Sequence, residues 1–286
     1  MELAFDPVVI VLLAAAEYLY VRAVRILRRR GQTISTRQQA FWHAGIALEA
    51  IALLGPLDPL ADDLVSAHMV QHMLLGDLAA PLLLAGLRNP VHVFFLPRPA
   101  LVALARRRRL RAAFRVLRSP LAAPVVYLVV LYGWHLAFAF DAAARHPGIH
   151  VLQHECFLIA ALLVWWPAIE PQHRRLPGEL WKIPYLFGVR MISMFLGVAL
   201  IFMQSPAYSG FYGERAREHG LTPLGDQRLG GGIMMTLDII IMVATLCFFF
   251  WRAAADDAEA QAAERAAYLT VSVPTMPPSR WPGTEQ

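Results

Sequence analysis

Seven runs of apolar residues, most of them long enough to cross a lipid bilayer, take up the greater part of the chain. A membrane-spanning helix needs about 20 predominantly apolar residues. Helix is the expected conformation because a lipid-exposed backbone must satisfy its own hydrogen bonds. We therefore predict an all-α polytopic membrane protein, a bundle of about seven transmembrane helices. The expected spans are 6–27, 40–57, 65–87, 120–140, 148–167, 183–204 and 231–252.

Positive charge alternates between the connecting segments and predicts the orientation of the bundle. Arginines cluster after the first, third and fifth spans, whereas the turn at 58–63 carries aspartates and neither lysine nor arginine. Because cytoplasmic loops are enriched in Lys and Arg, we predict the N-terminus outside and the C-terminus in the cytoplasm. The first run is too long for a cleaved signal peptide, so we expect it to remain as a span.

The composition changes after Trp251, first to alanine, aspartate and glutamate and then to prolines. We therefore predict one seven-helix transmembrane domain over residues 1–254 and a cytoplasmic tail over 255–286. A short amphipathic helix followed by a disordered end is expected in this tail. The arginine-rich loop 100–118 is expected to form a basic helix at the membrane surface.

The overall composition excludes several classes of protein. Hydrophobic residues make up 57% of the chain and charged residues only 16%, whereas soluble domains carry about 25% charged residues. This excludes a soluble enzyme and a disordered protein. The net charge of +5 is explained by the arginine-rich loops beside lipid headgroups, so we expect the lipid bilayer as a partner and no nucleic acid.

Five histidines from three spans are expected at one depth, near the outer face of the membrane. His68 and His72 lie in the first turns of the third span, and His150 and His154 repeat this i, i+4 spacing in the fifth. The spacing places each pair on one helix face. His135 lies near the outer end of the fourth span. Since neutral imidazole is the commonest metal ligand, these five histidines at one depth in the membrane predict a metal site.

Thioethers and carboxylates accompany these histidines. Met69 and Met73 follow the first pair, and Met234 shares a face of the seventh span with Asp238. Imidazole with thioether suits copper, and thioether favours Cu(I), whereas zinc gains little from methionine. Glu155 could bind the metal or orient an imidazole. The candidate metal ligands are therefore His68, His72, His135, His150, His154, Met69, Met73, Met234 and Asp238.

Charged residues also lie near the middle of the spans, where they are costly and tend to face the interior of a bundle. Glu49, Asp77 and Arg190 are in this position. We interpret Arg190 as the partner of one of these two acids in a structural ion pair.

Motifs that carry enzymatic chemistry are missing from the sequence. There is no HExxH, P-loop, GxSxG or GxGxxG motif, so we expect no enzymatic activity. The two cysteines, Cys156 and Cys247, lie inside apolar runs and form no CxxC pair. Transfer of copper through thiolates is therefore not available to this chain.

Four sequence blocks, in order from about residue 60 to 240, resemble the CtaG-type family of multi-spanning cytochrome c oxidase assembly proteins. The first runs from Ser66 to Leu75 (SAHMVQHMLL), followed by Pro81 and Gly86. The others are Trp134-His135 with Asp141, His150-x-x-x-His154 ahead of Trp165-Trp166-Pro167, and Asp226-Gln227-x-x-Gly230-Gly231 with Met234.

This resemblance implies a role in the maturation of the oxidase, by delivering copper or helping to insert it at the outer face. It also implies cytochrome c oxidase subunits as partners and the inner (plasma) membrane of a bacterium as the location. It maps family motif positions onto His68, His72, His135, His150, His154 and Asp226.

Three alternatives remain open from the sequence. Histidines on facing spans also bind haem in electron-transfer proteins, although two i, i+4 pairs exceed the two axial ligands of one haem. The charges in the middle of the spans could line the pathway of a copper transporter, although no inverted repeat is visible. A metal-free assembly partner would use the histidines as hydrogen-bonding groups between helices.

Overall fold

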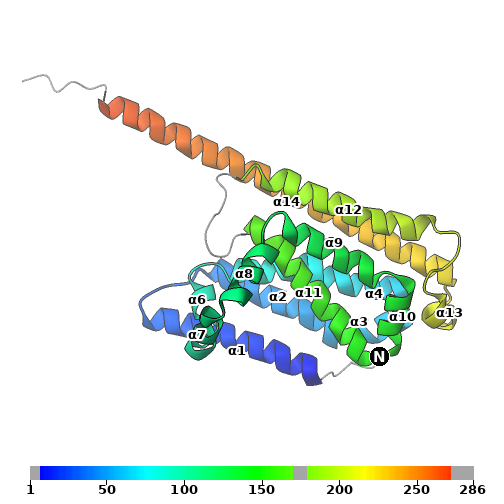
Figure 1. Ribbon diagram of the computed structural model, residues 1–286. Helices are drawn as coiled ribbons and strands as arrows, with labels where there is room; N and C mark the ends of the chain where they lie inside the picture. Colours follow the sequence, from blue (N-terminus) through cyan, green and yellow to red (C-terminus); the bar gives the residue numbers. More distant parts are fainter. Residues whose placement is uncertain (1–6, 170–178, 272–286) are drawn as a thin grey trace, which may run out of the picture.

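The computed structural model describes residues 7–169 and 179–271, and every element within these ranges is a helix (Figure 1). The predicted all-α class is thereby confirmed, whereas the predicted disordered end lies largely outside the described residues. The helices are α1 (Pro7–Arg29), α2 (Thr36–Leu54), α3 (Leu57–Asp63), α4 (Val65–Met73), the π-helix η1 (Leu74–Ala79), α5 (Ala80–Gly86), α6 (Val91–Phe95), α7 (Arg98–Arg106), α8 (Arg108–Leu117), α9 (Ala122–Trp134), α10 (Ala137–Arg145), α11 (Pro147–Ile169), α12 (Lys182–Phe202), α13 (Ser209–Glu218) and α14 (Pro223–Val271).

The predicted number of membrane spans agrees with the helices of the structure. In the described part of the chain, five helices are each long and apolar enough to cross a membrane: α1, the run from α4 through η1 to α5, α11, α12 and α14. Two bent pairs raise the total to as many as seven. These are α2 with α3, bent by 47°, and α8 with α9, bent by 78°.

The fourth span is shorter than the range 120–140 predicted from its hydropathy. Helix α9 ends at Trp134, Leu136 has extended backbone, and the separate helix α10 begins at Ala137. The carbonyl oxygen of Leu131 accepts hydrogen bonds from both the backbone nitrogen and the ring Nδ1 of His135, at 3.3 and 2.7 Å. His135 therefore caps the end of a helix rather than lying within one.

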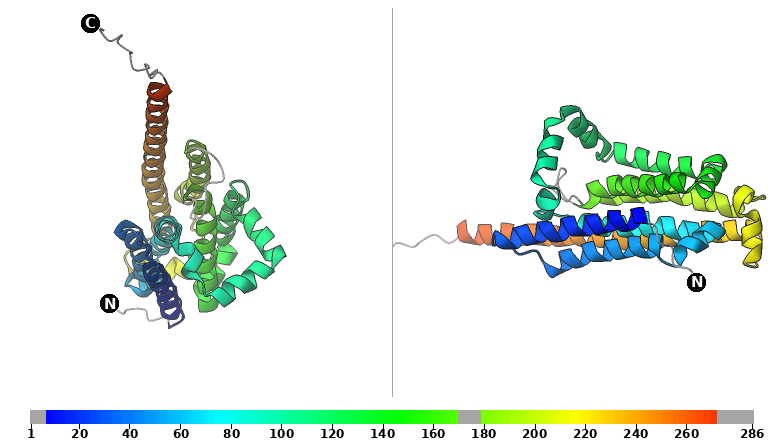
Figure 2. Two further views of the ribbon diagram at one scale, coloured as in Figure 1. Left: turned by 90° about the vertical axis from the view of Figure 1, so that its left-hand side faces the viewer. Right: turned by 90° about the horizontal axis from the view of Figure 1, so that it is seen from below.

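The last helix is much longer than the expected span 231–252. It begins at Pro223 and continues for 49 residues to Val271, so the tail contains no separate short helix before that point. Alanine has the highest helix propensity, and the alanine-rich segment after the apolar run extends the same helix. The end of α14 projects beyond the other helices (Figures 1 and 2).

The run from α4 to α5 is the central element of the bundle. In its most apolar window 67% of the residues are buried, compared with 22% in α1. Within α4, every residue except Val70 is buried. The first sequence block therefore lies in the interior, where its polar side chains are shielded from lipid.

Helix α12 packs closely against the first part of α14 (Figure 1). Two glycines let their backbones approach closely, because a Cβ atom on Gly231 would lie 2.7 Å from the carbonyl oxygen of Gly197. On the neighbouring side of α14, a Cβ on Gly230 would lie 3.2 Å from Cγ of Met69. The two adjacent glycines thus let α14 approach both α12 and α4, as small residues do in membrane bundles.

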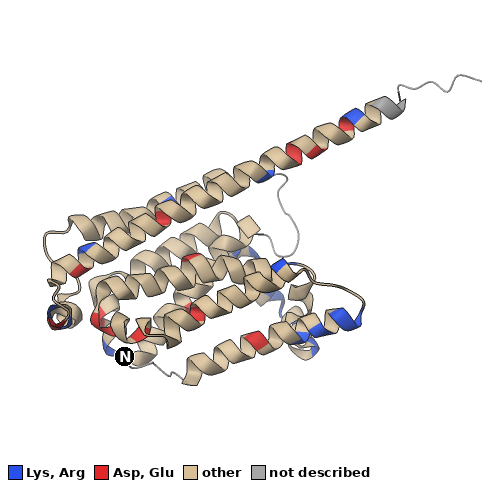
Figure 3. Cartoon of the chain, turned by 180° about the vertical axis from the view of Figure 1, so that it is seen from behind, with Lys and Arg blue, Asp and Glu red and all other residues tan. Residues whose placement is uncertain are grey.

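Many of the Lys and Arg residues lie at one end of the bundle, near the end of α1 and around α7 and α8 (Figure 3). The basic segment expected at 100–118 forms α7 and α8, and neither helix has a buried residue. The histidine-bearing starts of α4 and α11 lie at the opposite end from these basic helices.

Candidate metal centre

The five candidate histidines come together in one cluster. Helix α4 carries His68 and His72, α11 carries His150 and His154, and His135 follows the end of α9. The ring centroids within each pair are 4.3 Å apart. Between helices, the centroids are 5.1 Å apart for His68 and His150, 5.4 Å for His72 and His154, and 5.9 Å for His72 and His135.

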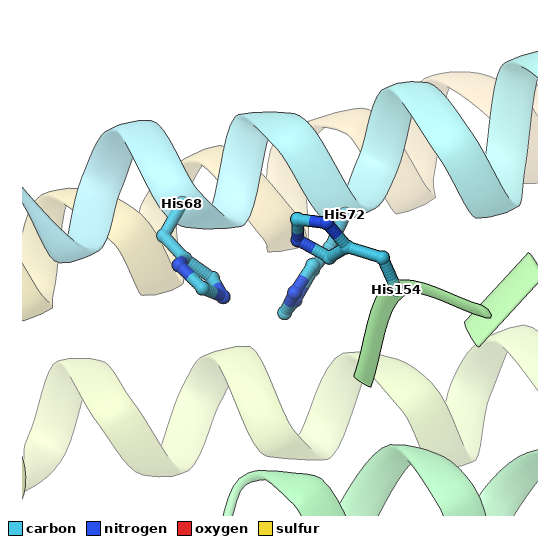
Figure 4. A group of neighbouring side chains, drawn as sticks. All are labelled: His68, His72 and His154. Atoms are coloured by element: carbon cyan, nitrogen blue, oxygen red, sulfur yellow. The ribbon is translucent and has the colours of Figure 1, made fainter. Parts of the chain in front are cut away.

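Three of these imidazoles are close enough to share one metal ion. In His68, His72 and His154, one ring nitrogen of each residue lies within 4.8 Å of the others (Figure 4). All three side chains are buried. In Figure 4 the rings of His68 and His72 hang side by side from α4 and that of His154 lies beside them. Three imidazoles on two rigid helices are a suitable arrangement for a metal that prefers nitrogen ligands.

Several ring nitrogens in the cluster have no hydrogen-bond partner among the described residues. Both ring nitrogens of His72 and the Nε2 atoms of His150 and His154 are buried without such a partner. Buried polar atoms are normally hydrogen-bonded, because an unpaired one costs about 1–3 kcal/mol. Nitrogen lone pairs left open in this way can bind a metal ion.

The hydroxyl of Tyr212 sets the tautomer of His68. It lies 3.1 Å from the carbonyl oxygen of Ala61 and 3.2 Å from Nδ1 of His68. Since the carbonyl can only accept, the hydroxyl donates to Ala61 and its oxygen accepts from the Nδ1–H of His68. Burial raises the pKa of Tyr212 above its ordinary value, so the phenol stays protonated at neutral pH. The Nε2 atom of His68 is then the unprotonated nitrogen.

His135 is fixed in the same tautomer and faces a sulfur atom. Its Nδ1 donates to the carbonyl oxygen of Leu131 at 2.7 Å, and its Nε2 lies 3.4 Å from Sδ of Met69. In the neutral imidazole this Nε2 carries a lone pair and no proton, and a thioether has no proton either. Two possible ligand atoms of a soft metal therefore face each other across a short distance.

A small cavity connects the histidines with other candidate residues. Its volume is about 20 Å³, which is room for about one water molecule. Five of the predicted residues line it: His72, Met73, His135, Met234 and Asp238. The structure thus brings these residues of α4, α9 and α14 to one place.

Two carboxylates that were predicted as possible metal ligands interact with other charged residues in the structure. Asp238 lines the cavity but pairs with Arg190, at 2.9 Å between Oδ1 and Nη1. Glu155 is half-buried and interacts electrostatically with the buried Glu49. Arg190 also pairs with Asp77. The sequence predicted an ion pair of Arg190 with either Asp77 or Glu49, and in the described contacts Arg190 does not pair with Glu49.

Asp226 connects two helices instead of facing the cavity. Its two carboxylate oxygens accept hydrogen bonds from the backbone nitrogens of Val65 and Ser66, at 2.7 and 3.1 Å. Helix α4 has no side-chain cap of its own at this end, so Asp226 of α14 caps it. Next to it, Gln227 accepts from the backbone nitrogen of Ala207 and donates to the carbonyl oxygen of Leu200. The sequence block that begins at Asp226 therefore holds the start of α4, which carries the first sequence block, in position.

Sequence reasoning missed two residues at the site. Tyr212 is 144 positions from His68, and no local motif marks it. Asp77 was identified only as a charge in the middle of a span, although it lies in the π-helical turn directly after the histidine pair and lines the same cavity. Such a turn could not be recognised from hydropathy.

Comparisons with known proteins agree with the motif resemblance. The family described as cytochrome c oxidase caa3 assembly factor matches residues 18–256, a range that includes all the candidate residues. Two proteins described as uncharacterized, from Mycobacterium bovis and Mycobacterium tuberculosis, are each 27% identical over 242 residues, and one from Mycobacterium leprae is 25% identical over 244. These matches cover 79% of this chain and 36% of each relative, so the chain spans about a third of their length. No solved structure matches the chain significantly.

Proposed function

This chain belongs to the cytochrome c oxidase caa3 assembly factor family, and from this premise we propose that it carries Cu(I) for the oxidase. The ion is bound by the buried histidine and methionine centre and passed to a copper centre of an oxidase subunit. By the positive-inside rule, the centre lies toward the outer face of a bacterial inner membrane. The copper is cargo, and the handover is an exchange of ligands without catalytic turnover.

The contact between His135 and Met69 carries this proposal. Leu131 keeps the proton of His135 on Nδ1, so the atoms that face each other at 3.4 Å are an unprotonated nitrogen and a thioether sulfur. Neither atom can donate a hydrogen bond to the other in the neutral imidazole. A cation bound between them converts the contact of two lone pairs into a pair of metal–ligand bonds.

The choice of ligand atoms favours copper over zinc. Three clustered imidazoles would serve either metal, but a thioether adds affinity mainly for a soft ion such as Cu(I). The free cysteines do not compete: Cys156 is half-buried, Cys247 is exposed, and neither belongs to the cluster found among the described residues. A centre of neutral nitrogen and sulfur ligands can release its ion to an acceptor that offers thiolates.

The burial of the histidines suggests the route of the ion. His150 is half-buried at the start of α11, whereas His68, His72, His135 and His154 are at most 7% exposed. The ring of His150 stacks on that of His68 at an interplanar angle of 27°. We propose His150 as the entry and exit ligand, from which copper reaches the buried imidazoles.

The geometry does not favour the haem alternative. The imidazoles of the cluster lie in contact with one another, and Phe157 packs on His72 with ring centroids 4.3 Å apart. The cavity of about 20 Å³ beside them has room for about a water molecule and not for a porphyrin ring.

The direct test measures copper in the purified full-length chain. The protein, in detergent, is loaded anaerobically with Cu(I), desalted and analysed by elemental mass spectrometry. We expect about one copper per chain and its loss in the double variant His68→Ala/His72→Ala. The matched control is His43→Ala, which removes a partly exposed histidine that pairs with Glu17 on another part of the bundle.

Either of two results would refute the copper proposal: folded wild-type protein without copper, or full binding in the double variant. Assembly of the oxidase in cells is a second readout. Deleting the gene should lower the copper content of the oxidase, and added copper should partly restore it. Uptake of labelled copper into sealed vesicles that contain the protein would instead indicate a transporter.

A further inference from the structure

A buried group of three charges lies beside the candidate centre. Arg190 of α12 pairs with Asp77 of η1 and with Asp238 of α14. The three side chains are at most 5% exposed. With both carboxylates ionised, this acid–base triad (Asp77, Arg190 and Asp238) carries a net charge of −1. Ionisable groups inside a membrane bundle are costly and commonly have a function.

The triad and the histidines meet in the same cavity. Its lining includes His72 and His135 as well as Asp77 and Asp238. The cavity is only about 20 Å³ in volume, so no protein layer separates the two groups. An ion bound by the imidazoles would therefore interact with the charge of the triad through a medium of low dielectric constant.

The π-helical turn η1 explains how Asp77 reaches this place. Asp77 follows His72 by five residues, and in an α-helix residues five apart point about 140° away from each other. A π-helix closes its hydrogen bonds between residues five apart, so its wider turn brings such residues toward the same face. The π-turn Leu74–Ala79 begins two residues after His72, and both side chains consequently line one cavity.

We infer that the triad supplies the counter-charge of the metal centre and makes it selective for a monovalent cation. This inference rests on the proposed function, because it concerns the ion held by the same histidines. Imidazole and thioether ligands are neutral, so a bound ion brings its full charge into the bundle. A monovalent ion is balanced by the charge of −1, whereas a divalent ion would leave one buried positive charge uncompensated, which is strongly unfavourable.

Arg190 has a specific part in this selectivity. Two aspartates without the arginine would carry a charge of −2, which matches a divalent ion. By offsetting one of the two charges, Arg190 lowers the preference of the site for divalent ions. The arginine is held over the rings of Trp165 and Tyr127, with 5.2 and 5.9 Å between its Cζ and the ring centroids, so its position is fixed by packing as well as by charge.

The test compares a monovalent with a divalent probe in the full-length chain. Affinities for Ag(I), a redox-stable substitute for Cu(I), and for Zn(II) are measured in detergent for wild type, Asp238→Asn, Asp77→Asn and Arg190→Gln. Each Asp→Asn variant leaves a neutral Arg–Asp pair, so the bundle keeps a balanced core. The control is Ser193→Ala, which changes a neutral residue of the same cavity whose hydroxyl donates to the carbonyl of Val189.

We expect each Asp→Asn variant to bind Ag(I) about tenfold more weakly, which corresponds to about 1.4 kcal/mol, and Ser193→Ala to bind as wild type. Arg190→Gln should bind Zn(II) at least about tenfold more tightly than wild type does. If wild type binds Ag(I) but both Asp→Asn variants bind it equally well, the inference is overturned and the copper proposal stands. If folded wild type binds neither probe, the proposed function fails, and the inference fails with it.

Discussion

Asp226 on α14 accepts two hydrogen bonds from Ser66 on α4, one from the backbone nitrogen at 3.1 Å and one from the hydroxyl at 2.5 Å. A second oxygen of the carboxylate accepts from the backbone nitrogen of Val65. The start of the helix that carries His68 and His72 is therefore capped by a residue 160 positions away. This long-range cap positions the histidine pair without contacting it.

Replacing Asp226 with asparagine should destabilise the protein by about 1–3 kcal/mol, because an amide presents a donor where one of the accepting oxygens stood. Thermal unfolding in detergent, followed by far-UV circular dichroism, measures this change. The control is Asp257→Asn on an exposed turn of the same helix. An equal melting temperature for both variants would show that the cap contributes nothing.

Replacing Met69 with leucine should weaken Cu(I) binding about tenfold while the fold is retained, because leucine fills a similar volume without a sulfur atom. X-ray absorption at the copper edge should then lose its sulfur scattering. Met242→Leu is the matched control, since Met242 is half-buried on α14 and does not line the cavity among the described residues. Unchanged sulfur scattering in Met69→Leu would exclude Met69 as a ligand.

Replacing Tyr212 with phenylalanine should weaken metal binding about 10- to 100-fold, the usual effect of removing a partner that orients a ligand. The variant removes the acceptor of the Nδ1 proton of His68, so either ring nitrogen can carry that proton. Tyr132→Phe serves as the control, because its exposed hydroxyl donates to the carbonyl of Ile192 and contacts no histidine in the described interactions. A competition titration with a Cu(I) chelator measures both variants. Equal affinities would contradict the assigned tautomer.

Replacing Gly231 with alanine should lower stability by about 1–3 kcal/mol, because the new Cβ would lie 2.7 Å from the carbonyl oxygen of Gly197 and α12 must move away. The neighbouring Gly232→Ala is an exacting control, since its Cβ would have no atom within 4 Å. There the higher helix propensity of alanine should leave stability unchanged or slightly raised. Chemical unfolding in detergent distinguishes the two, and a neutral Gly231→Ala would contradict the close approach of the helices.

Much of the fold could be predicted because its determinants are local. Hydropathy identified the spans, and the i, i+4 spacing placed each histidine pair on one helix face. The errors occurred where another local effect competes with hydropathy: the ring of His135 helps to end α9 before residue 140, and the alanine-rich tail extends α14 to Val271. The five histidines predicted at one depth form one cluster because the rings carried by α4, by α11 and by the end of α9 meet between the helices.

The sequence by itself determined that this protein is an all-α membrane bundle, that its polar residues include paired histidines with methionines nearby, and that it resembles an oxidase assembly family. Only the tertiary structure decided which ring nitrogens are free, because Tyr212 and the carbonyl of Leu131 fix the protons of His68 and His135. It also decided that Asp77 and Asp238 share a cavity with His72. Helix periodicity acts over a few residues, whereas tautomers and ion pairs depend on atoms brought together from distant parts of the chain.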